Sequence, residues 1–433
     1  MLQTVRQACT PHASVLRADP EPDIEDLAQV VRAAEADADR FFSRNHVTSG
    51  MKQLFELGIA RLDGRSEQGV YTLTQAMGGG KTHLMVAFGL IAKSPELRQR
   101  VLDGTGIRVP NSFGAARVVA FSGRNNPDHY IWGEIASQLG KAEAFARFWN
   151  PGPKAPDEKD WIGLIGDQPT LIMLDELPPW IDYASTITVG QGTLANTATY
   201  ALGTLFSAVL KLPRTMVILS NLSAAYTNAS KMLAQTLNNI RQEANRGVKE
   251  ITPVALNTTE IFDILRKRLF EKLPGAREVD EVAAAYAKSM DEAVRSRIVA
   301  MTPEQYAEQI RRCYPFHPRL RDLVALFRNN ERFRQTRGLL RLVGRVVRDV
   351  WAEKRPDNVH LIGVQHMDLN DPDMRNEVLP LSDLQEAVAK DIADGGQAHA
   401  EIINREVGSD AEPRWPMCCL RRHSCAVLMR RRG

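Results

Sequence analysis

A run of three glycines stands directly before a lysine and a threonine, and these residue types at this spacing could bind phosphate. Lys81 and Thr82 complete the pattern GxxxxGK followed by Ser or Thr (Walker A), whereas Gln75 stands where the first glycine of that pattern belongs. Consecutive backbone N–H groups at a helix N-terminus cradle phosphate oxygens. We expect the lysine to reach the β- and γ-phosphates and the threonine hydroxyl to hold Mg²⁺. The glycines are Gly78, Gly79 and Gly80.

The neighbouring sequence supplies the context that such a loop requires. The strand-like segment "GVYTLT" precedes the glycines, and an apolar helix is predicted from Lys81 to about Ala92. Gln75 occupies the position that opens the loop and touches the phosphates least, so it is tolerable if its φ is negative. The alternative is a flexible glycine-rich turn with an accidental Lys-Thr pair. The agreement of motif and context favours the phosphate loop.

A second motif follows 94 residues after Lys81. Asp175 ends the apolar run 171–174, which has the form of a buried parallel strand, and Glu176 follows at once. A carboxylate at that strand end would bind the Mg²⁺ shell (Walker B), and the next acid would orient and polarise the attacking water. The pair favours an ATPase over a small-molecule kinase. The alternative is a surface Asp-Glu pair that opens a turn before two prolines.

The segment "TMVILSN" ends in two polar residues, Ser220 and Asn221. In a parallel sheet we expect this strand to lie between the other two, so that its terminal side chain reaches the γ-phosphate and the water. Asn221 is the first choice for that role and Ser220 the second, and capping of the next turn is the alternative. Arg246 closes the following helix, where a guanidinium can project to the phosphate of a neighbouring subunit in a homo-oligomer.

Arginines concentrate between Arg311 and Arg355, where 12 arginines and 1 lysine oppose 4 acids, a local net charge of +9. The segment "RQTRGLLRLVGRVV" spaces four of them by four, four and three residues, so they lie on nearby faces of a helix. One of them could fold back onto the γ-phosphate, and DNA binding is the lesser alternative. For Arg345 and Arg348 solvent exposure is the favoured expectation. The four are Arg337, Arg341, Arg345 and Arg348.

Length and composition set broad limits. The 433 residues are too many for one small core, and the 44% hydrophobic and 25% charged content is ordinary for a globular protein. The net charge of +3 names no partner. No stretch reaches the length of an apolar membrane span and the N-terminus lacks the apolar core of a signal peptide, so we expect a cytoplasmic protein without membrane association. The five cysteines show no CxxC spacing and predict no disulfide framework.

Strands and helices alternate from about residue 70 to 256, which predicts an α/β fold with a P-loop NTPase parallel sheet and helices on both faces. From residue 258 to about 354 the pattern is helical throughout and predicts an all-helical lid domain. The polar connector 182–199 is long for an ordinary loop and is expected to be functional or mobile. The five expected strands are "GVYTLT", "ARVVAF", "TLIMLDE", "TMVILSN" and "ITPVAL".

These patterns predict five divisions of the chain. The Cys- and Arg-rich C-terminal tail has no periodicity, and we expect it to be non-native, out-of-frame or disordered sequence. The divisions are an N-terminal helical extension (1–45), the α/β core (46–257), the helical lid (258–356), the start of a further region (357–412) and the tail (413–433).

The combination of a phosphate loop, an Asp-Glu strand, a polar third strand and a helical lid resembles the AAA+ ATPases. More narrowly, "GGGKTH", "IWGEIASQLG", "DELPPWI", "YPFHPRL" and "QTRGLLRLVG" resemble a bacterial ATPase family of unknown function that is often found in anti-phage gene clusters beside DNA methyltransferase genes. The resemblance implies ATP and Mg²⁺ as ligands and assigns Arg337 to the phosphate sensor of the lid. The roles of Asn221 and Arg246 follow only the general AAA+ pattern.

The resemblance implies ATP binding and hydrolysis within a phage-defence or DNA-restriction system, with DNA and defence proteins as partners. The alternative is a nucleotide-gated module that binds DNA or protein without useful turnover. Gln75 departs from the pattern and bears on the rate of hydrolysis more than on binding. Members of the family are longer than this chain, so we expect an N-terminal ATPase piece.

Overall fold

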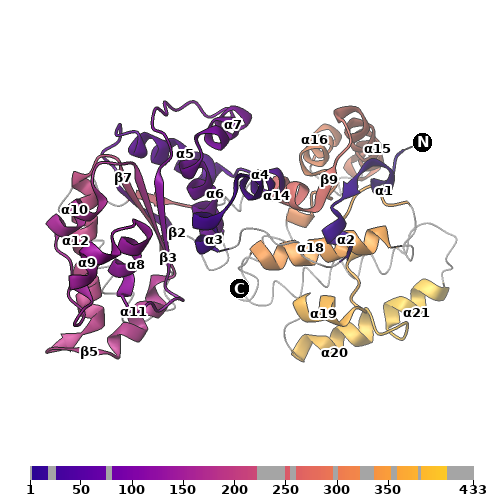
Figure 1. Ribbon diagram of the computed structural model, residues 1–433. Coiled ribbons are helices and arrows are strands. Elements are labelled where there is room, and N and C mark those ends of the chain that lie inside the picture. The colour runs from indigo at the N-terminus through magenta and orange to yellow at the C-terminus, as the bar shows by residue number, and fades with distance from the viewer. Residues whose placement is uncertain are drawn as a thin grey trace. The chain divides into compact units, whose positions relative to one another are not determined.

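The computed structural model describes residues 2–17, 26–74, 80–221, 249–253, 260–295, 301–321, 336–352, 358–378 and 382–406. The chain forms two compact units (Figure 1). Residues 22–255 form the first, here called the α/β unit, and residues 1–21 join residues 256–433 in the second, here called the helical unit. The structure thus divides the predicted extension 1–45 between the two units.

Five parallel strands form the sheet of the α/β unit, in the order β3-β4-β7-β2-β8. The segment "TMVILSN" forms β7 and pairs with β2 on one side and β4 on the other, so its predicted place between them is confirmed. The last strand is shifted from its predicted span 251–256, since it ends before Pro253, which has no N–H for a ladder. The strands are β2 (Val70–Thr74), β3 (Arg117–Ser122), β4 (Thr170–Asp175), β7 (Thr215–Asn221) and β8 (Lys249–Ile251).

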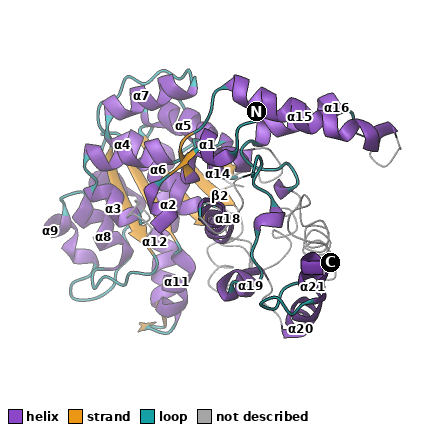
Figure 2. Cartoon of the chain, turned by 90° about the vertical axis from the view of Figure 1, so that its right-hand side faces the viewer, coloured by secondary structure: helices purple, strands orange, loops and turns teal. Residues whose placement is uncertain are grey.

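Helices cover both faces of this sheet, as Figures 1 and 2 show and as predicted. Alternate residues of each strand enter opposite cores: in β7, Met216 and Ile218 face one core, whereas Val217 and Leu219 face the other. One core contains α3 (Leu27–Arg32), α4 (Glu35–Arg44), α5 (Ser49–Leu62), α6 (Lys81–Lys93) and α7 (Pro95–Thr105). The other contains α8 (Tyr130–Gln138), α9 (Ala142–Phe145), α10 (Glu158–Ile165), α11 (Leu177–Ser185) and α12 (Leu194–Lys211).

The polar connector 182–199 is a small hairpin between two helices and not an open loop. Strands β5 (Thr188–Val189) and β6 (Gly192–Thr193) pair antiparallel, and Gly190 turns between them with a φ of 58°. The Thr193 side chain caps α12 by accepting from the backbone N–H of Asn196. The Gly- and Thr-rich composition that suggested a loop therefore serves a turn and a helix cap.

In the helical unit, the N-terminal residues pack against elements that follow residue 256. Strand β1 (Thr10–Pro11) pairs antiparallel with β9 (Phe270–Lys272), a strand inside the stretch predicted to be helical throughout. Arg6 donates to the carbonyl oxygens of Val350 and Ala352 at the end of α18. The helices are α1 (Val5–Ala8), α2 (Ala13–Arg17), α14 (Glu260–Leu269), α15 (Ala276–Arg295), α16 (Pro303–Cys313), α18 (Thr336–Trp351), α19 (Pro372–Val378), α20 (Ser382–Asp391) and α21 (His399–Glu406).

A buried carboxylate organises the loop before α21. Glu401 Oε2 accepts from the backbone N–H groups of Asp394, Gly396 and Ala398, at 2.7–3.2 Å, and Oε1 accepts from the Asn370 amide at 2.7 Å. Burial raises the pKa of Glu401, but these hydrogen bonds outweigh it and leave the pKa below its ordinary value of 4.5. The ionised form therefore stabilises the folded state.

Glu401→Gln is expected to lower the free energy of unfolding at pH 7 by about 1–3 kcal/mol, because an amide cannot accept all of these bonds. A carboxyl whose folded pKa is depressed contributes stability above its unfolded pKa and loses it as the pH falls through the folded pKa. The difference between wild type and variant should therefore shrink below pH 4.5. Urea unfolding at several pH values measures it, with the exposed Glu386→Gln as the matched control. A constant difference at all pH values would contradict the assignment.

Candidate functional site

The glycine-rich segment stands in the sequence between strand β2 and helix α6, the two elements that were expected on either side of it. β2 ends at Thr74 and α6 begins at Lys81. Gly80 is the N-cap residue of α6 and has φ 88° and ψ 15°, a left-handed conformation that glycine adopts without steric cost. Gly78, Gly79 and Gln75 lie outside the described residues.

Four predicted site residues meet at this helix start. The Thr82 hydroxyl donates to Asp175 Oδ2 at 2.5 Å, although the two residues are 93 positions apart. Lys81 is only 7% exposed and Asp175 only 5%. Burial lowers the pKa of Lys81, and the negative charges of Asp175 and Glu176 act in the opposite direction. The structure thus places one cation, one hydroxyl and two carboxylates together.

Sheet topology explains this meeting. The strands are parallel, so their carboxyl ends lie along one edge of the sheet, which is where ligands bind in open α/β folds. β7 separates β2 from β4, so the two functional strands are about 10 Å apart at a strand spacing of ~4.8 Å. The chain leaves β2 at this edge and enters α6, whose first turn brings Thr82 to the end of β4.

Glu176 has an unusual backbone and an ion pair that sequence reasoning missed. Its φ is 50° and its ψ is 40°, and it serves as the N-cap residue of α11. The Arg124 guanidinium forms an ion pair with its carboxylate, with Nη2 at 2.8 Å from Oε1. Strand register could have found this arginine, because Ser122 of β3 pairs with Asp175 and Arg124 follows two residues later.

A side-chain hydroxyl from β7 and a backbone N–H from the residue after β3 also reach the turn at Glu176. Its N–H donates to the Ser220 hydroxyl at 3.0 Å. From the β3 side, the Gly123 N–H donates to the Asp175 carbonyl oxygen at 2.8 Å. A Cβ at Gly123 would lie 2.0 Å from the Glu176 carbonyl oxygen, so only glycine fits this approach. Neither Gly123 nor this bond of Ser220 was predicted from the sequence.

Three other predicted residues are not brought into this site by the described structure. Asn221 is the last residue of β7 and pairs in register with Thr74, but its side chain lies outside the described residues. Arg246 lies outside them altogether. Arg337 belongs to α18 of the helical unit, and its side chain is likewise outside the description.

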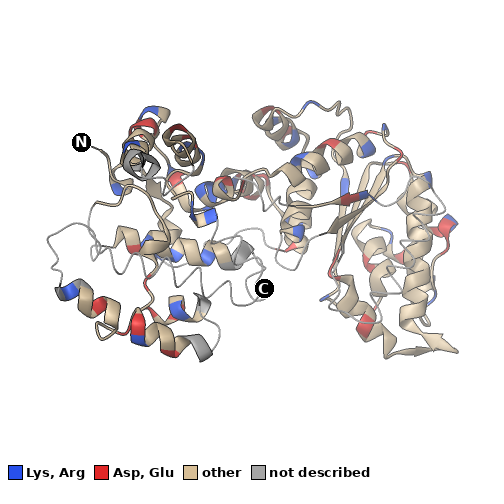
Figure 3. Cartoon of the chain, turned by 180° about the vertical axis from the view of Figure 1, so that it is seen from behind, with Lys and Arg blue, Asp and Glu red and all other residues tan. Residues whose placement is uncertain are grey.

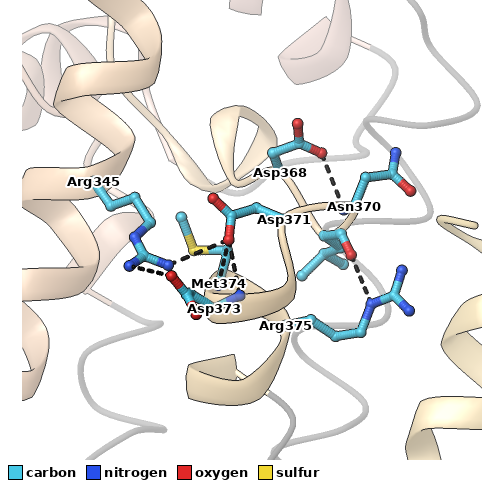
Figure 4. A network of polar contacts seen from close by, with 8 residues as sticks. Arg345, Asp368, Asn370, Asp371, Asp373, Met374 and Arg375 are labelled. Atoms are coloured by element: carbon cyan, nitrogen blue, oxygen red, sulfur yellow. Dashed lines mark hydrogen bonds and ion pairs between the residues drawn. The ribbon is translucent and has the colours of Figure 1, made fainter. Parts of the chain in front are cut away.

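The expectation that Arg345 and Arg348 are solvent-exposed is wrong, since both are half-buried and hold partners. Arg345 forms ion pairs with Asp371 at 3.3 Å and with Asp373 at 3.2 Å, and its side chain is 21% exposed (Figure 4). Asp371 Oδ1 also accepts from the backbone N–H groups of Asp373 and Met374, at the start of α19. Arg348 donates to the Val15 carbonyl oxygen at 3.2 Å. These two arginines therefore stabilise the fold of the helical unit.

Acids that precede the +9 segment in the sequence, on α15 and α16, compensate further arginines of it. Arg311 pairs with Asp280 of α15 and with Glu308, and Arg312 pairs with Glu308. Both signs of charge accordingly occur on the helices of this unit (Figure 3). Part of the arginine excess in the sequence is thus paired with acids in the folded helical unit. This pairing weakens the alternative of a DNA-binding face.

The donor set at the start of α6 fits Mg²⁺. Thr82 and Asp175 offer a hydroxyl and a carboxylate oxygen, the hard ligands that this ion prefers, and Mg²⁺ in phosphate sites takes one or two carboxylates and keeps several waters. Within the described ranges, no group of three or more His, Cys, Asp or Glu side chains could hold a metal ion. Also within those ranges, no helix is both long enough and apolar enough to cross a membrane.

Two parts of the chain match family models. No curated protein matches the sequence. A solved structure of C. elegans PCH-2 aligns with 73% of this chain and 64% of that chain, at 11% sequence identity and a TM-score of 0.26. Residues 15–108 match the DUF499 N-terminal domain and residues 257–410 match the DUF499 second domain. Over these residues the chain is thus similar to the two DUF499 domains, and neither match by itself covers half of the chain.

Proposed function

We propose that this chain is a P-loop protein of AAA+ type that binds ATP and hydrolyses it with Mg²⁺. The observation that carries the proposal is the contact between the Thr82 hydroxyl and the Asp175 carboxylate, beside the buried Lys81 at the first turn of α6. A surface Asp-Glu pair and an accidental Lys-Thr pair would have no reason to meet. Their meeting at the carboxyl edge of a parallel sheet supports a nucleotide site.

Each residue of this site has a role that follows from its chemistry. The helix N-terminus at Gly80 and the Lys81 ammonium attract phosphate oxygens, and the low exposure of Lys81 strengthens that attraction. Thr82 and Asp175 would hold Mg²⁺, which neutralises charge on the β- and γ-phosphate oxygens when it is bound. Glu176 would orient the attacking water and accept its proton.

The ion pair between Arg124 and Glu176 is compatible with this role. The Arg124 side chain is 71% exposed and that of Glu176 is 24% exposed, so solvent screens their attraction. Exposed pairs of this kind contribute only about 0.2–1 kcal/mol. The carboxylate can therefore turn from the guanidinium to a water molecule at small cost.

The wider assignments extend the same proposal. Residues 46–257 are the ATPase core and 258–356 the lid, and the second DUF499 match, which begins at residue 257, supports a boundary there. Asn221 contacts the γ-phosphate and water, Arg337 senses the γ-phosphate from the lid, and Arg246 acts across the interface of a homo-oligomer. The protein works in the cytoplasm within a phage-defence or DNA-restriction system.

Mg²⁺-dependent ATP hydrolysis, measured with and without duplex DNA, tests the proposal. Turnover that requires Mg²⁺ is the expected result, and stimulation by DNA would support the link to DNA restriction. The second candidate, a module that holds ATP without useful turnover, predicts ATP binding with no hydrolysis under either condition. If the protein neither binds nor hydrolyses ATP, both candidate functions are refuted.

Arg337→Ala is expected to slow ATP hydrolysis by at least about tenfold while ADP affinity stays within about twofold, because ADP lacks the phosphate that this guanidinium contacts. Steady-state turnover and ADP titration measure the two effects. Arg277→Ala is the control, since Arg277 is 88% exposed on α15 of the same unit. Full turnover of the Arg337 variant would remove the sensor assignment and leave the phosphate loop unaffected.

A further inference from the structure

We propose that Ser220 and Gly123 are positioning residues that fix the peptide of Glu176 from the two neighbouring strands, and so aim its carboxylate at the water. This inference rests on the proposed ATPase function. Neither residue touches the reacting atoms in this assignment. Both act through the backbone of Glu176, which is the group that does the chemistry.

The backbone of Glu176 has a conformation that a residue with a side chain rarely adopts. A φ of 50° is left-handed, and Glu176 is one of two non-glycine residues with positive φ in the described part of the chain. Side-chain atoms make this conformation unfavourable, so it persists only where the surrounding structure holds it. It turns the chain from β4 directly into α11, whose N-cap is Glu176. Something must therefore hold this residue in place.

A hydroxyl from β7 holds the backbone N–H of Glu176. The backbone pairing of β4 with β7 ends at Leu174 and Leu219, because the chain then turns away. The Glu176 N–H consequently has no carbonyl partner in the ladder, and the Ser220 hydroxyl accepts from it at 3.0 Å. Ser220 is 5% exposed, so water does not offer a ready substitute.

Gly123, the residue after β3, closely approaches the backbone at Glu176 from the other side. The Gly123 N–H donates to the Asp175 carbonyl oxygen, and a Cβ at residue 123 would lie 2.0 Å from the Glu176 carbonyl oxygen. Such a contact with backbone cannot be relieved by moving a flexible side chain. The Asp175–Glu176 peptide is thus held from both neighbours, at its N–H by the Ser220 hydroxyl and at its carbonyl oxygen by the Gly123 N–H, next to the contact between Thr82 and Asp175.

Ser220→Ala tests the first of the two positioning residues. We expect kcat to fall by about 10–100-fold, since a displacement of about 1 Å of a catalytic group can cost 100-fold. ATP and ADP affinity should each change by less than about twofold, and Ser220→Thr, which keeps the hydroxyl, should restore kcat to within about threefold of wild type. Ser185→Ala removes an exposed hydroxyl that also bonds to backbone, and is the matched control.

A direct contact of Ser220 with phosphate gives a different result. The variant would then lose affinity for ATP more than for ADP, and its effect would add to that of Glu176→Gln. If Ser220 acts through Glu176, its effect should largely vanish in the Glu176→Gln background. Additive effects, or a kcat of Ser220→Ala equal to that of wild type, would overturn the positioning role.

Gly123→Ala tests the second residue and is expected to lower kcat by at least about tenfold with ATP affinity unchanged within about twofold.

Amide hydrogen exchange provides a measurement that does not depend on turnover. Ser220→Ala should accelerate exchange at the Glu176 amide by at least about tenfold relative to the Leu174 amide in β4. Equal exchange at Glu176 in wild type and variant would overturn the geometry. Absence of turnover in the wild type would refute the proposed ATPase function. The exchange result would then still decide whether Ser220 holds the Glu176 peptide.

Discussion

Replacing Lys81 with alanine is expected to weaken ATP binding by at least about tenfold, which corresponds to ~1.4 kcal/mol. The ammonium is the fixed charge of this site that would lie against the β- and γ-phosphates, and it is only 7% exposed. Its loss also removes the positive charge that opposes the negative charges of Asp175 and Glu176. Both effects disfavour the approach of a polyanion.

Titration of ATP into wild type and variant, by calorimetry or with a fluorescent analogue, measures this effect. Lys52→Ala is the matched control, because Lys52 is exposed on α5 of the same unit. Its ATP affinity should equal that of wild type. Thermal unfolding without nucleotide should show that Lys81→Ala is folded. Equal ATP affinity in wild type and a folded Lys81 variant would refute the phosphate loop.

Glu176→Gln is expected to reduce ATP turnover by about 100- to 10,000-fold, the range attributed to a positioned general base. Glutamine has nearly the same shape but cannot accept the proton of the attacking water. ATP affinity should be retained, because Lys81 and Thr82 are unchanged. This result would also separate the two candidate functions, since a module without turnover has no rate to lose.

Two further variants make this experiment specific. Glu143→Gln removes an exposed carboxylate from α9 and should leave turnover unchanged. Arg124→Ala breaks the same ion pair as Glu176→Gln but retains the carboxylate. A far greater loss in Glu176→Gln than in Arg124→Ala assigns the effect to the carboxylate itself. Comparable losses in the two would assign it to the ion pair and contradict the role of general base.

Local pattern determined much of the sheet. Apolar runs bounded by polar residues located four of the five strands to within about a residue, and the alternation with helices indicated parallel pairing. The carboxylates at the end of β4 were found because a buried strand that ends in acids is visible in the sequence. The strand β9 was missed because three residues between helical patterns carry too little periodic signal.

The sequence by itself thus determined the strand before the glycines, the helix that begins at Lys81 and the strand that ends in Asp175, because these follow from short-range periodicity. The place of β7 between β2 and β4 was predicted from the expected parallel sheet and not from periodicity. Only the tertiary structure decided which distant residues meet. Arg124 reaches Glu176, and residues 1–21 join the unit that contains residue 256 onward. Arg345, expected in solvent, pairs with Asp371. Such contacts depend on strand register and on packing between segments far apart in the chain, and no local pattern encodes either.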